Sequence, residues 1–404
     1  MNQDELANLN KLQDRRYLAK CILPEHDELL STLRSLMPST GNFNELFCNV
    51  FLNESVEMLK HAFFLYEDGY FDCAFYSVRQ SIENINNMLI SALDSNKYKL
   101  WKDKARFPPD KAIKEQLNQQ NAAYNEIKNA IPEFFEKYDN LLKQAHKIIH
   151  KQGFDTFYTC QHSVIKQKQE ERTLLFVSFL KHGIGMLLIM SIVLDPLALA
   201  LSDSEVDSHI PFEPMTEAIP LYVFEEYLSI DIINKIRNTS YYLSLKEYFL
   251  SLEKLNDATY LVLRYDYFDV NKLDGIEKQL NQLCLLETLM FCILRIGIEA
   301  THFYCENSIM GYSTSIEQTM PITSYSSNQF DEYLKHKTPN YPWQRMYITG
   351  FKVFESYLII QHNNVLSNDE LSNIEFLINI ANKCYQSEKE DWINILNKDI
   401  LGSN

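Results

Sequence analysis

Hydrophobic residues in the first half of the chain recur at steps of three and four, the spacing typical of amphipathic helices. Between residues 44 and 68 this apolar stripe comprises Val56, Leu59, Ala62, Phe63 and Tyr66. The stripe predicts a helix that ends at Asp68–Gly69, because glycine readily takes the left-handed conformation that closes a helix. A second stripe begins at once, over 71–93. So short a connection predicts two antiparallel neighbouring helices.

The pattern predicts further helices along the rest of the chain. They are expected at 119–130, 132–151, 174–201, 221–238, 241–256, 272–306, 344–361 and 367–398. The β-branched and aromatic residues of 258–268 favour one short strand, and the Ser, Thr, Asn and Pro of 307–343 predict an extended loop. We therefore expect an all-α protein. Residues 1–43 would form an N-terminal helical arm, 44–160 a helical bundle, and 161–404 a helical C-terminal region that regulates the bundle or binds a partner.

The most apolar stretch, 174–201, is interrupted by Lys181, His182 and Asp195–Pro196. Its uncharged run from Gly183 to Leu194 has twelve residues, whereas a helix needs about 20 to span a bilayer. We expect a buried core helix and no membrane segment.

Charge restricts the partners. The 404 residues include 54 acidic and 38 basic side chains, a net charge of −16, which argues against a broad electrostatic grip on a phosphate backbone. The exception is the segment 96–116. Its basic residues are Lys97, Lys99, Lys102, Lys104, Arg106, Lys111 and Lys114. This segment is either a solvated loop or a rim that binds RNA, with Lys102, Lys104 and Arg106 as the candidate contacts.

The eight cysteines include no CxxC pair, which is typical of reduced thiols in a cytoplasmic protein. The first twenty residues lack the basic and apolar regions of a secretory signal. No ligand cluster predicts a metal site, and the chain has no GxxxxGK[ST], GxGxxG, HExxH or GxSxG motif. With only 10 glycines, a loop that cradles phosphates is not expected, and we expect no cofactor.

His150 stands near the end of the predicted helix 132–151, where the negative end of the helix dipole favours a charged imidazole. Lys143 lies seven residues earlier on the same helical face, and Asn140 lies just before it. An imidazole beside a cation and an amide suits metal-free RNA cleavage, because the histidine moves protons and the cation stabilises the phosphate. The simpler interpretation is a histidine that only caps its own helix. His146, one turn earlier, could share a proton with His150 or be polar surface.

The run HAFFLYEDGYFDCAFYSVRQSIENI, followed by HKIIHKQGFDTFY, resembles the HEPN family (higher eukaryotes and prokaryotes nucleotide-binding). The resemblance covers about residues 45–160. Gly69, Tyr70, Ala74, Gln80 and Glu83 match the family's turn and second helix in order. His150 matches the family's histidine, whereas Lys143 stands where the family has arginine.

The resemblance implies a metal-independent endoribonuclease that acts as an RNA-targeting toxin or an antiviral defence effector, in the form of a homodimer. His150 would be the acid or base, Lys143 the phosphate ligand and Asn140 a positioning donor. The alternative is a non-catalytic HEPN-like scaffold that binds a protein partner, with the C-terminal half as the docking region.

Two further assignments stay open. Arg295 and His302, within the predicted helix 272–306, have the family's spacing of arginine and histidine and form an alternative catalytic pair. Tyr158 either stacks on an RNA base or packs against the turn in which it lies.

Overall fold

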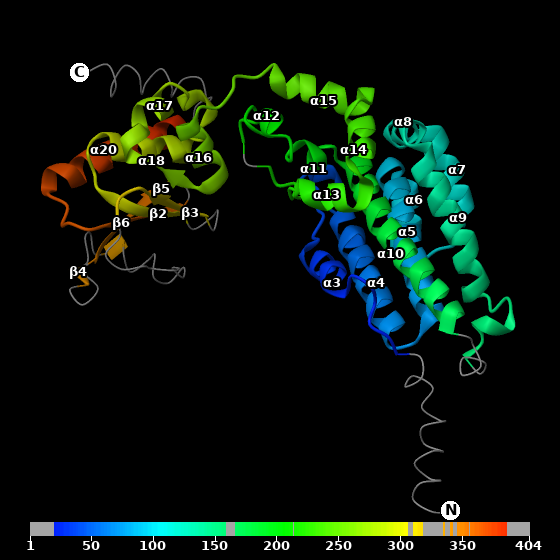
Figure 1. Ribbon diagram of the computed structural model, residues 1–404. Coiled ribbons are helices and arrows are strands. Elements are labelled where there is room, and N and C mark those ends of the chain that lie inside the picture. Colours follow the sequence, from blue (N-terminus) through cyan, green and yellow to red (C-terminus); the bar gives the residue numbers. More distant parts are fainter. Residues whose placement is uncertain are drawn as a thin grey trace, which may run out of the picture. The chain divides into compact units, whose positions relative to one another are not determined.

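The computed structural model describes residues 20–158, 166–212, 214–305, 310–317, 334–335, 340–341, 346–354 and 356–385 (Figure 1). The chain divides into two compact units. Met1–Asp207 with Pro214–Ser251 form the first, here termed the helical unit. Ser208–Glu213 with Leu252–Asn404 form the second, termed the mixed unit because it combines helices with a sheet. The boundary expected at residue 160 is therefore wrong.

The described residues of the helical unit form helices and no strand. They are α3 (His26–Ser35), η1 (Phe43–Glu45), α4 (Cys48–Glu67), α5 (Phe71–Leu93), α6 (Ser95–Lys102), α7 (Asp110–Gln120), α8 (Ala122–Ala130), α9 (Pro132–Ile149), η2 (Phe154–Thr156), α10 (Lys166–Leu194), α11 (Leu197–Ala200), α12 (Ser204–Asp207), α13 (Leu221–Leu228), α14 (Ile230–Arg237) and α15 (Ser240–Leu250). The predicted pair 44–68 and 71–93 is confirmed as α4 and α5. Gly69 closes α4 with φ 88°, and the backbone N–H of Tyr70 donates to Leu65 O at 2.8 Å.

Helix α10 carries the apolar stretch and explains why the unit continues past residue 160. It packs against α4, α5 and α9 (Figure 1). Gly183 and Gly185 allow these close approaches, since a Cβ on Gly183 would lie 2.9 Å from Val78 Cγ1 and one on Gly185 would lie 2.7 Å from Phe134 Cζ. By length and composition Gln169–Leu194 could cross a membrane, but 89% of its most apolar window is buried inside the unit, which is the pattern of a core helix.

The N-terminal region that the structure describes belongs to this unit. Leu29 and Leu33 of α3 are fully buried, and α3 packs on α4. The Glu67 carboxylate accepts hydrogen bonds from Leu23 N at 2.9 Å and pairs with His26 Nδ1 at 2.7 Å. Residues 20–43 are thus part of the helical core and do not form a separate arm, while 1–19 lie outside the described residues.

A buried carboxylate fixes the connections that follow α10. Asp195 is 8% exposed, and its Oδ2 accepts hydrogen bonds from the hydroxyls of Thr40 and Thr216, both at 2.7 Å. Its Oδ1 accepts from Leu197 N at 3.0 Å at the start of α11. One carboxylate therefore ties together segments near residues 40, 196 and 216.

The mixed unit contains α16 (Asp257–Tyr265), β1 (Tyr267–Phe268), η4 (Val270–Lys272), α17 (Leu273–Glu277), η5 (Leu280–Gln282), α18 (Leu285–Arg295), β2 (Ala300–Cys305), β3 (Met310–Thr314), β4 (Asn340–Tyr341), β5 (Met346–Val353), β6 (Ser356–His362) and α20 (Asn368–Tyr385). The strands form one sheet in the order β1-β3-β2-β6-β5-β4. The β1–β3 pair is parallel and the other pairs are antiparallel. The all-α expectation holds only as a mostly helical chain and is wrong for this unit.

Five predicted elements differ from the structure. Among its described residues, the predicted extended loop 307–343 contains the strands β3 and β4. The predicted helix 344–361 falls on the β5–β6 hairpin, where β-branched and aromatic residues pair across the strands. The predicted helix 272–306 is divided into α17, η5 and α18 and then gives way to β2. Most of the predicted strand 258–268 is α16, because the Asn256 side chain caps the helix by accepting from Ala258 N and Thr259 N. The predicted helix 221–238 breaks at Ser229, which has φ 67°.

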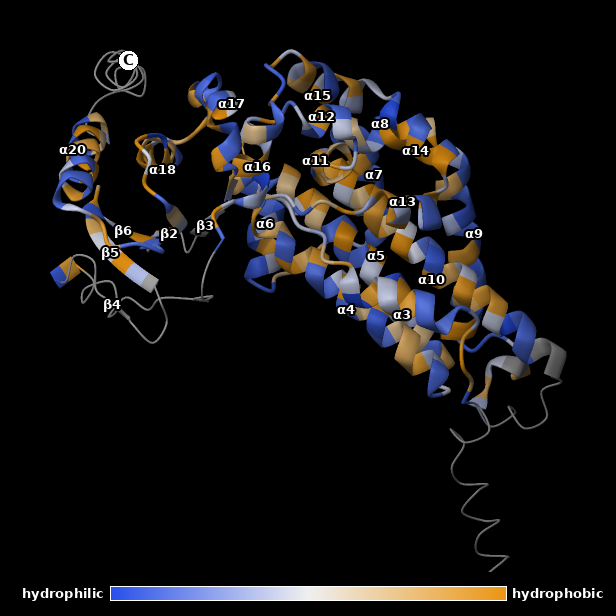
Figure 2. Cartoon of the chain, turned by 60° about the vertical axis from the view of Figure 1, so that its left-hand side comes forward, coloured by the Kyte–Doolittle hydropathy of each residue, from blue (hydrophilic) through white to orange (hydrophobic). Residues whose placement is uncertain are grey.

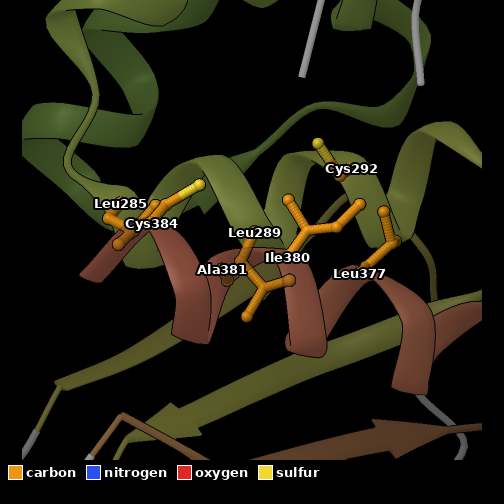
Figure 3. A pocket seen from close by; sticks show the side chains of 7 residues that line it. All are labelled: Leu285, Leu289, Cys292, Leu377, Ile380, Ala381 and Cys384. Atoms are coloured by element: carbon orange, nitrogen blue, oxygen red, sulfur yellow. The ribbon is translucent and has the colours of Figure 1, made fainter. Parts of the chain in front are cut away.

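The described part of the predicted helix 367–398 is confirmed as α20, and residues 386–398 lie outside the described residues. Helices α18 and α20 pack on each other around a small pocket. Its lining residues are Leu285, Leu289, Cys292, Leu377, Ile380, Ala381 and Cys384 (Figure 3). The pocket has a volume of about 240 Å³ including its open mouth, which is below the usual size of a ligand site.

Candidate functional site

Helix α9 holds the sequence-predicted catalytic residues. It begins with Pro132, which suits a first helical position because its missing N–H would have no partner there. Its buried stripe comprises Phe134, Phe135, Tyr138, Leu141, Ala145 and Ile148. The opposite face is hydrophilic (Figure 2). Asn140, Lys143 and His150 lie on that face and are exposed.

The three residues share one face but are spread along the axis. At 1.5 Å per residue, Lys143 and His150 are separated by roughly 10 Å along the helix. His150 is the C-cap residue, with its backbone N–H donating to His146 O at 2.9 Å. The helix closes through Lys151, which has φ 55°, and Gln152 N donates to Lys147 O at 2.7 Å. His150 thus occupies the C-cap position through its backbone, and capping by its side chain stays a prediction.

The structure adds His146 to this group. Its ring centroid lies 5.6 Å from that of His150, with the rings at 72°. Burial lowers the pKa of His146, the Arg79 guanidinium and the His150 imidazole lower it further, and Glu83 opposes the shift. The Nε2 atom of His146 is buried and has no hydrogen-bond partner among the described residues. His146 is therefore a neutral imidazole near pH 7, the state needed in a general base.

Arg79, on α5, is near enough to His146 to lower its pKa. Its Nε donates to Glu83 Oε1 at 2.6 Å, one turn later on the same helix. Both side chains are partly buried, at 26% and 20% exposed. Within the described parts of the chain the Arg79 side chain makes no other hydrogen bond or ion pair. Its two terminal nitrogens thus keep the forked donor geometry that binds a phosphate.

Helix α7 packs next to these residues of α5 and α9. Lys114 forms an ion pair with Asp110 at 3.0 Å, and its ammonium lies 5.5 Å from the centre of the Tyr138 ring on α9. The Asp110 carboxylate also accepts a hydrogen bond from Asn86 of α5 at 2.8 Å. These contacts fix α7 against α5 and α9. We term Arg79, Glu83, His146 and His150 the histidine cluster.

A clamp holds the end of α9 against the start of α5. Lys151 Nζ lies 2.8 Å from Asp72 Oδ2 and 4.2 Å from the centre of the Tyr158 ring, and it donates to Thr156 O at 3.1 Å. The Tyr158 hydroxyl donates to Asp72 Oδ1. Burial raises the pKa of Asp72, but the hydrogen bonds from Lys151 and Tyr158 outweigh burial and the net pKa is lowered. The clamp fixes the backbone next to His150.

Tyr158 therefore packs in the turn, the second of its two sequence interpretations. Its ring also stacks on Phe71 with centroids 6.1 Å apart. The proposed contacts Lys102, Lys104 and Arg106 are all exposed at the end of α6 and in the turn after it. The segment 96–116 is thus largely helical, since it spans α6 and the start of α7, and the expectation of a solvated loop is wrong for those parts.

The alternative pair is separated by the fold. Arg295 ends α18 and forms ion pairs with Asp274 at 2.9 Å and Glu277 at 3.0 Å. His302 lies on β2, where burial lowers its pKa and its ring stacks on Tyr304. The shared helical face that the spacing predicted does not exist, because Gly297, with φ 92°, lies between the helix and the strand.

No group of three or more His, Cys, Asp or Glu that could hold a metal ion occurs among the described residues. Comparison of the chain with protein-family models, curated proteins and solved structures found no match.

Sequence reasoning missed Arg79, although it lies one residue before Gln80 of the quoted run. The signal was the pair Arg79 and Glu83, four residues apart, which places both on one face of α5. Neither the spacing nor the composition indicates that this face lies near His146, since α5 and α9 are separated by three further helices in the chain.

Proposed function

We propose that the helical unit cleaves RNA without a metal ion, through a HEPN-like reaction at the histidine cluster, and acts as an RNA-targeting toxin or antiviral defence effector. One observation carries the proposal: the imidazoles of His146 and His150 are 5.6 Å apart, and the Arg79 guanidinium is near enough to lower the pKa of His146. Two imidazoles and an arginine are a sufficient set for phosphodiester transfer.

In the proposed reaction the 2′-oxygen of a ribose attacks the adjacent phosphorus. Neutral His146 takes the proton of that hydroxyl, and protonated His150 gives a proton to the departing 5′-oxygen. The P–O5′ bond breaks as the P–O2′ bond forms, which leaves a 2′,3′-cyclic phosphate and a 5′-hydroxyl. Since Nε2 of His146 is buried, the proton transfer would use its Nδ1 or follow a side-chain rotation.

Arg79 is the better candidate than Lys143 for the phosphate ligand, because a guanidinium offers two parallel donors and an ammonium only a point charge. Lys143 and Asn140 lie further along α9 and would contact the neighbouring phosphates of a bound strand. The resemblance to the HEPN family leads us to propose in addition a cytoplasmic homodimer, with the mixed unit as its regulatory or partner-binding part.

The test incubates a labelled RNA oligonucleotide with the wild-type chain in EDTA and maps the ends of the products. We expect 2′,3′-cyclic phosphate ends and a rate reduced about 10²- to 10⁴-fold in His146→Ala and in His150→Ala. The matched control is His61→Ala, since His61 is an exposed histidine on α4 outside the cluster. Comparison of Arg79→Lys with Lys143→Gln shows which cation binds the reacting phosphate.

Cleavage that survives both histidine substitutions would refute the assignment of the site. Cleavage that EDTA abolishes and a divalent metal restores would refute the metal-free mechanism. A folded protein that cleaves no RNA but retains a protein partner would favour the scaffold function instead.

A further inference from the structure

A second surface of the helical unit is basic, although the chain as a whole is acidic. Between residues 97 and 111 there are six basic residues against Asp103 and Asp110. The basic residues are Lys97, Lys99, Lys102, Lys104, Arg106 and Lys111, here termed the α6 basic patch. Asp110 is already paired with Lys114. Within the part of the chain that the structure describes, no side chain of the patch forms an ion pair or a hydrogen bond. Such a patch attracts a polyanion.

Two backbone hydrogen bonds fix the turn after α6, which carries Lys104. Ala105 N donates to Leu100 O at 2.9 Å and Lys104 N donates to Trp101 O at 3.1 Å, which is the paired bonding of a Schellman motif. Lys104 takes the left-handed conformation, with φ 54°. Pro108 and Pro109 then lead directly into α7. This backbone conformation favours glycine, so the presence of lysine there indicates that its charge has a role.

Trp101 lies within the patch and keeps part of its ring accessible. It is 39% exposed, and its indole packs on Phe51 of α4 with centroids 4.4 Å apart. Tyr98 lies nearly parallel to the indole at 22° and packs in turn on Phe47. Among the described residues the indole N–H has no hydrogen-bond partner. A partly exposed aromatic side chain that is anchored by its neighbours can stack on a base.

We propose that the α6 basic patch binds a single strand of RNA, with Trp101 stacking on a base and the surrounding lysines and arginine contacting phosphates. The proposal rests on the proposed function, since it specifies the form of RNA that reaches the histidine cluster. Stacking requires an unpaired base, and a duplex buries its bases against one another. An anionic membrane is the less suitable partner, because Tyr98 and Trp101 are anchored on α4 and are not available for insertion into lipid.

The test measures binding of the full chain to a fluorescent 2′-O-methyl oligonucleotide of twelve nucleotides, which has no 2′-hydroxyl and cannot be cleaved by the proposed reaction. We expect Trp101→Leu to weaken binding roughly 5- to 150-fold, the range for loss of one base–aromatic stack. Trp101→Tyr, which keeps an aromatic face, should bind within a few-fold of wild type. Both variants retain an apolar side chain on Phe51, and circular dichroism checks that they fold.

Salt dependence tests the phosphate contacts. With five phosphates neutralised, the slope of log affinity against log salt should be about −3.5, and each cation removed should reduce it by about 0.7. Lys104→Gly is the sharpest variant, since glycine fits φ 54° without strain. Lys278→Gln, at an exposed lysine of the mixed unit, is the control and should leave the slope unchanged.

Equal binding by wild type and Trp101→Leu, equal affinity for a blunt duplex of the same length, or sedimentation with anionic vesicles in place of RNA binding would each overturn the proposal. Trp101-dependent binding in a protein that cleaves no RNA would support the patch and refute the nuclease. Cleavage that does not depend on Trp101 would support the nuclease and refute the patch.

Discussion

The clamp between α5 and α9 makes a quantitative prediction for Asp72→Asn. The carboxylate accepts from Tyr158 and pairs with Lys151 at 2.8 Å, and asparagine keeps an oxygen acceptor but loses the charge. A hydrogen bond to a charged group contributes about 1 kcal/mol more than a neutral one, so two such bonds give about 2 kcal/mol. Asp72 also lies in the first turn of α5, where a negative charge contributes about 0.5 kcal/mol. We expect the free energy of unfolding to fall by 2 to 2.5 kcal/mol.

Urea unfolding at pH 7, followed by circular dichroism, measures this change. The matched control is Asp68→Asn in the preceding turn, whose ion pair with Lys20 at 3.1 Å has both side chains more than half exposed. It should change the free energy of unfolding by less than about 0.5 kcal/mol.

The pH dependence gives the second readout. Because the folded-state pKa of Asp72 is lowered, its stabilisation is complete above the unfolded-state pKa of about 3.9 and is lost as pH falls through the folded-state value. The difference between wild type and Asp72→Asn should therefore be full at pH 7 and shrink below about pH 4. Equal destabilisation by Asp72→Asn and Asp68→Asn, or a difference that stays constant down to pH 3, would refute the reasoning.

Three other predictions follow from burial and packing. In the proposed cleavage reaction, the acidic limb of the pH–rate profile should lie below pH 6.5, the ordinary pKa of histidine, because the pKa of His146 is lowered. Arg79→Gln should move that limb to higher pH, since it removes a positive charge that lowers this pKa. A limb that does not move would exclude Arg79 from the site. Asp195→Ala should lower the free energy of unfolding, measured in urea, by about 3 kcal/mol, since it leaves buried hydroxyls such as that of Thr40 without their acceptor. A change below about 1 kcal/mol would show that these hydrogen bonds do not stabilise the unit. Gly185→Ala should lower the melting temperature, because the added methyl group would lie 2.7 Å from Phe134 Cζ and overpacking costs about 1 to 3 kcal/mol. A melting temperature equal to that of wild type would show that α9 can move away from α10.

Helical periodicity located α4, α5 and α9, because each of these helices has one buried face. The stripe from Val56 to Tyr66 and the glycine at 69 were sufficient to define α4 and its end. The same method failed for β5 and β6, where most residues of both strands are buried. A strand that is buried on both faces has no alternating pattern, so its apolar run is indistinguishable from that of a buried helix.

Only the site residues that lie on a single helix could be placed together from the sequence. The spacing of Asn140, Lys143 and His150 placed them correctly on one exposed face of α9. The partner residues Arg79 and Asp72 come from α5, and their contact with α9 depends on tertiary packing that no local pattern encodes. The spacing of Arg295 and His302 misled for the same reason, since the chain changes from helix to strand between them.

Because α10 packs against α4, α5 and α9, the order of synthesis determines when the helical unit can be completed on the ribosome. Helices α4, α5 and α9 are synthesised before α10, and their apolar faces then lack the surface that covers them in the finished unit. The nascent bundle therefore stays incomplete until α10, which ends at Leu194, has emerged. If the helical unit cleaves RNA as we propose, the complete unit would be present only once α10 has been made, about midway along the chain of 404 residues.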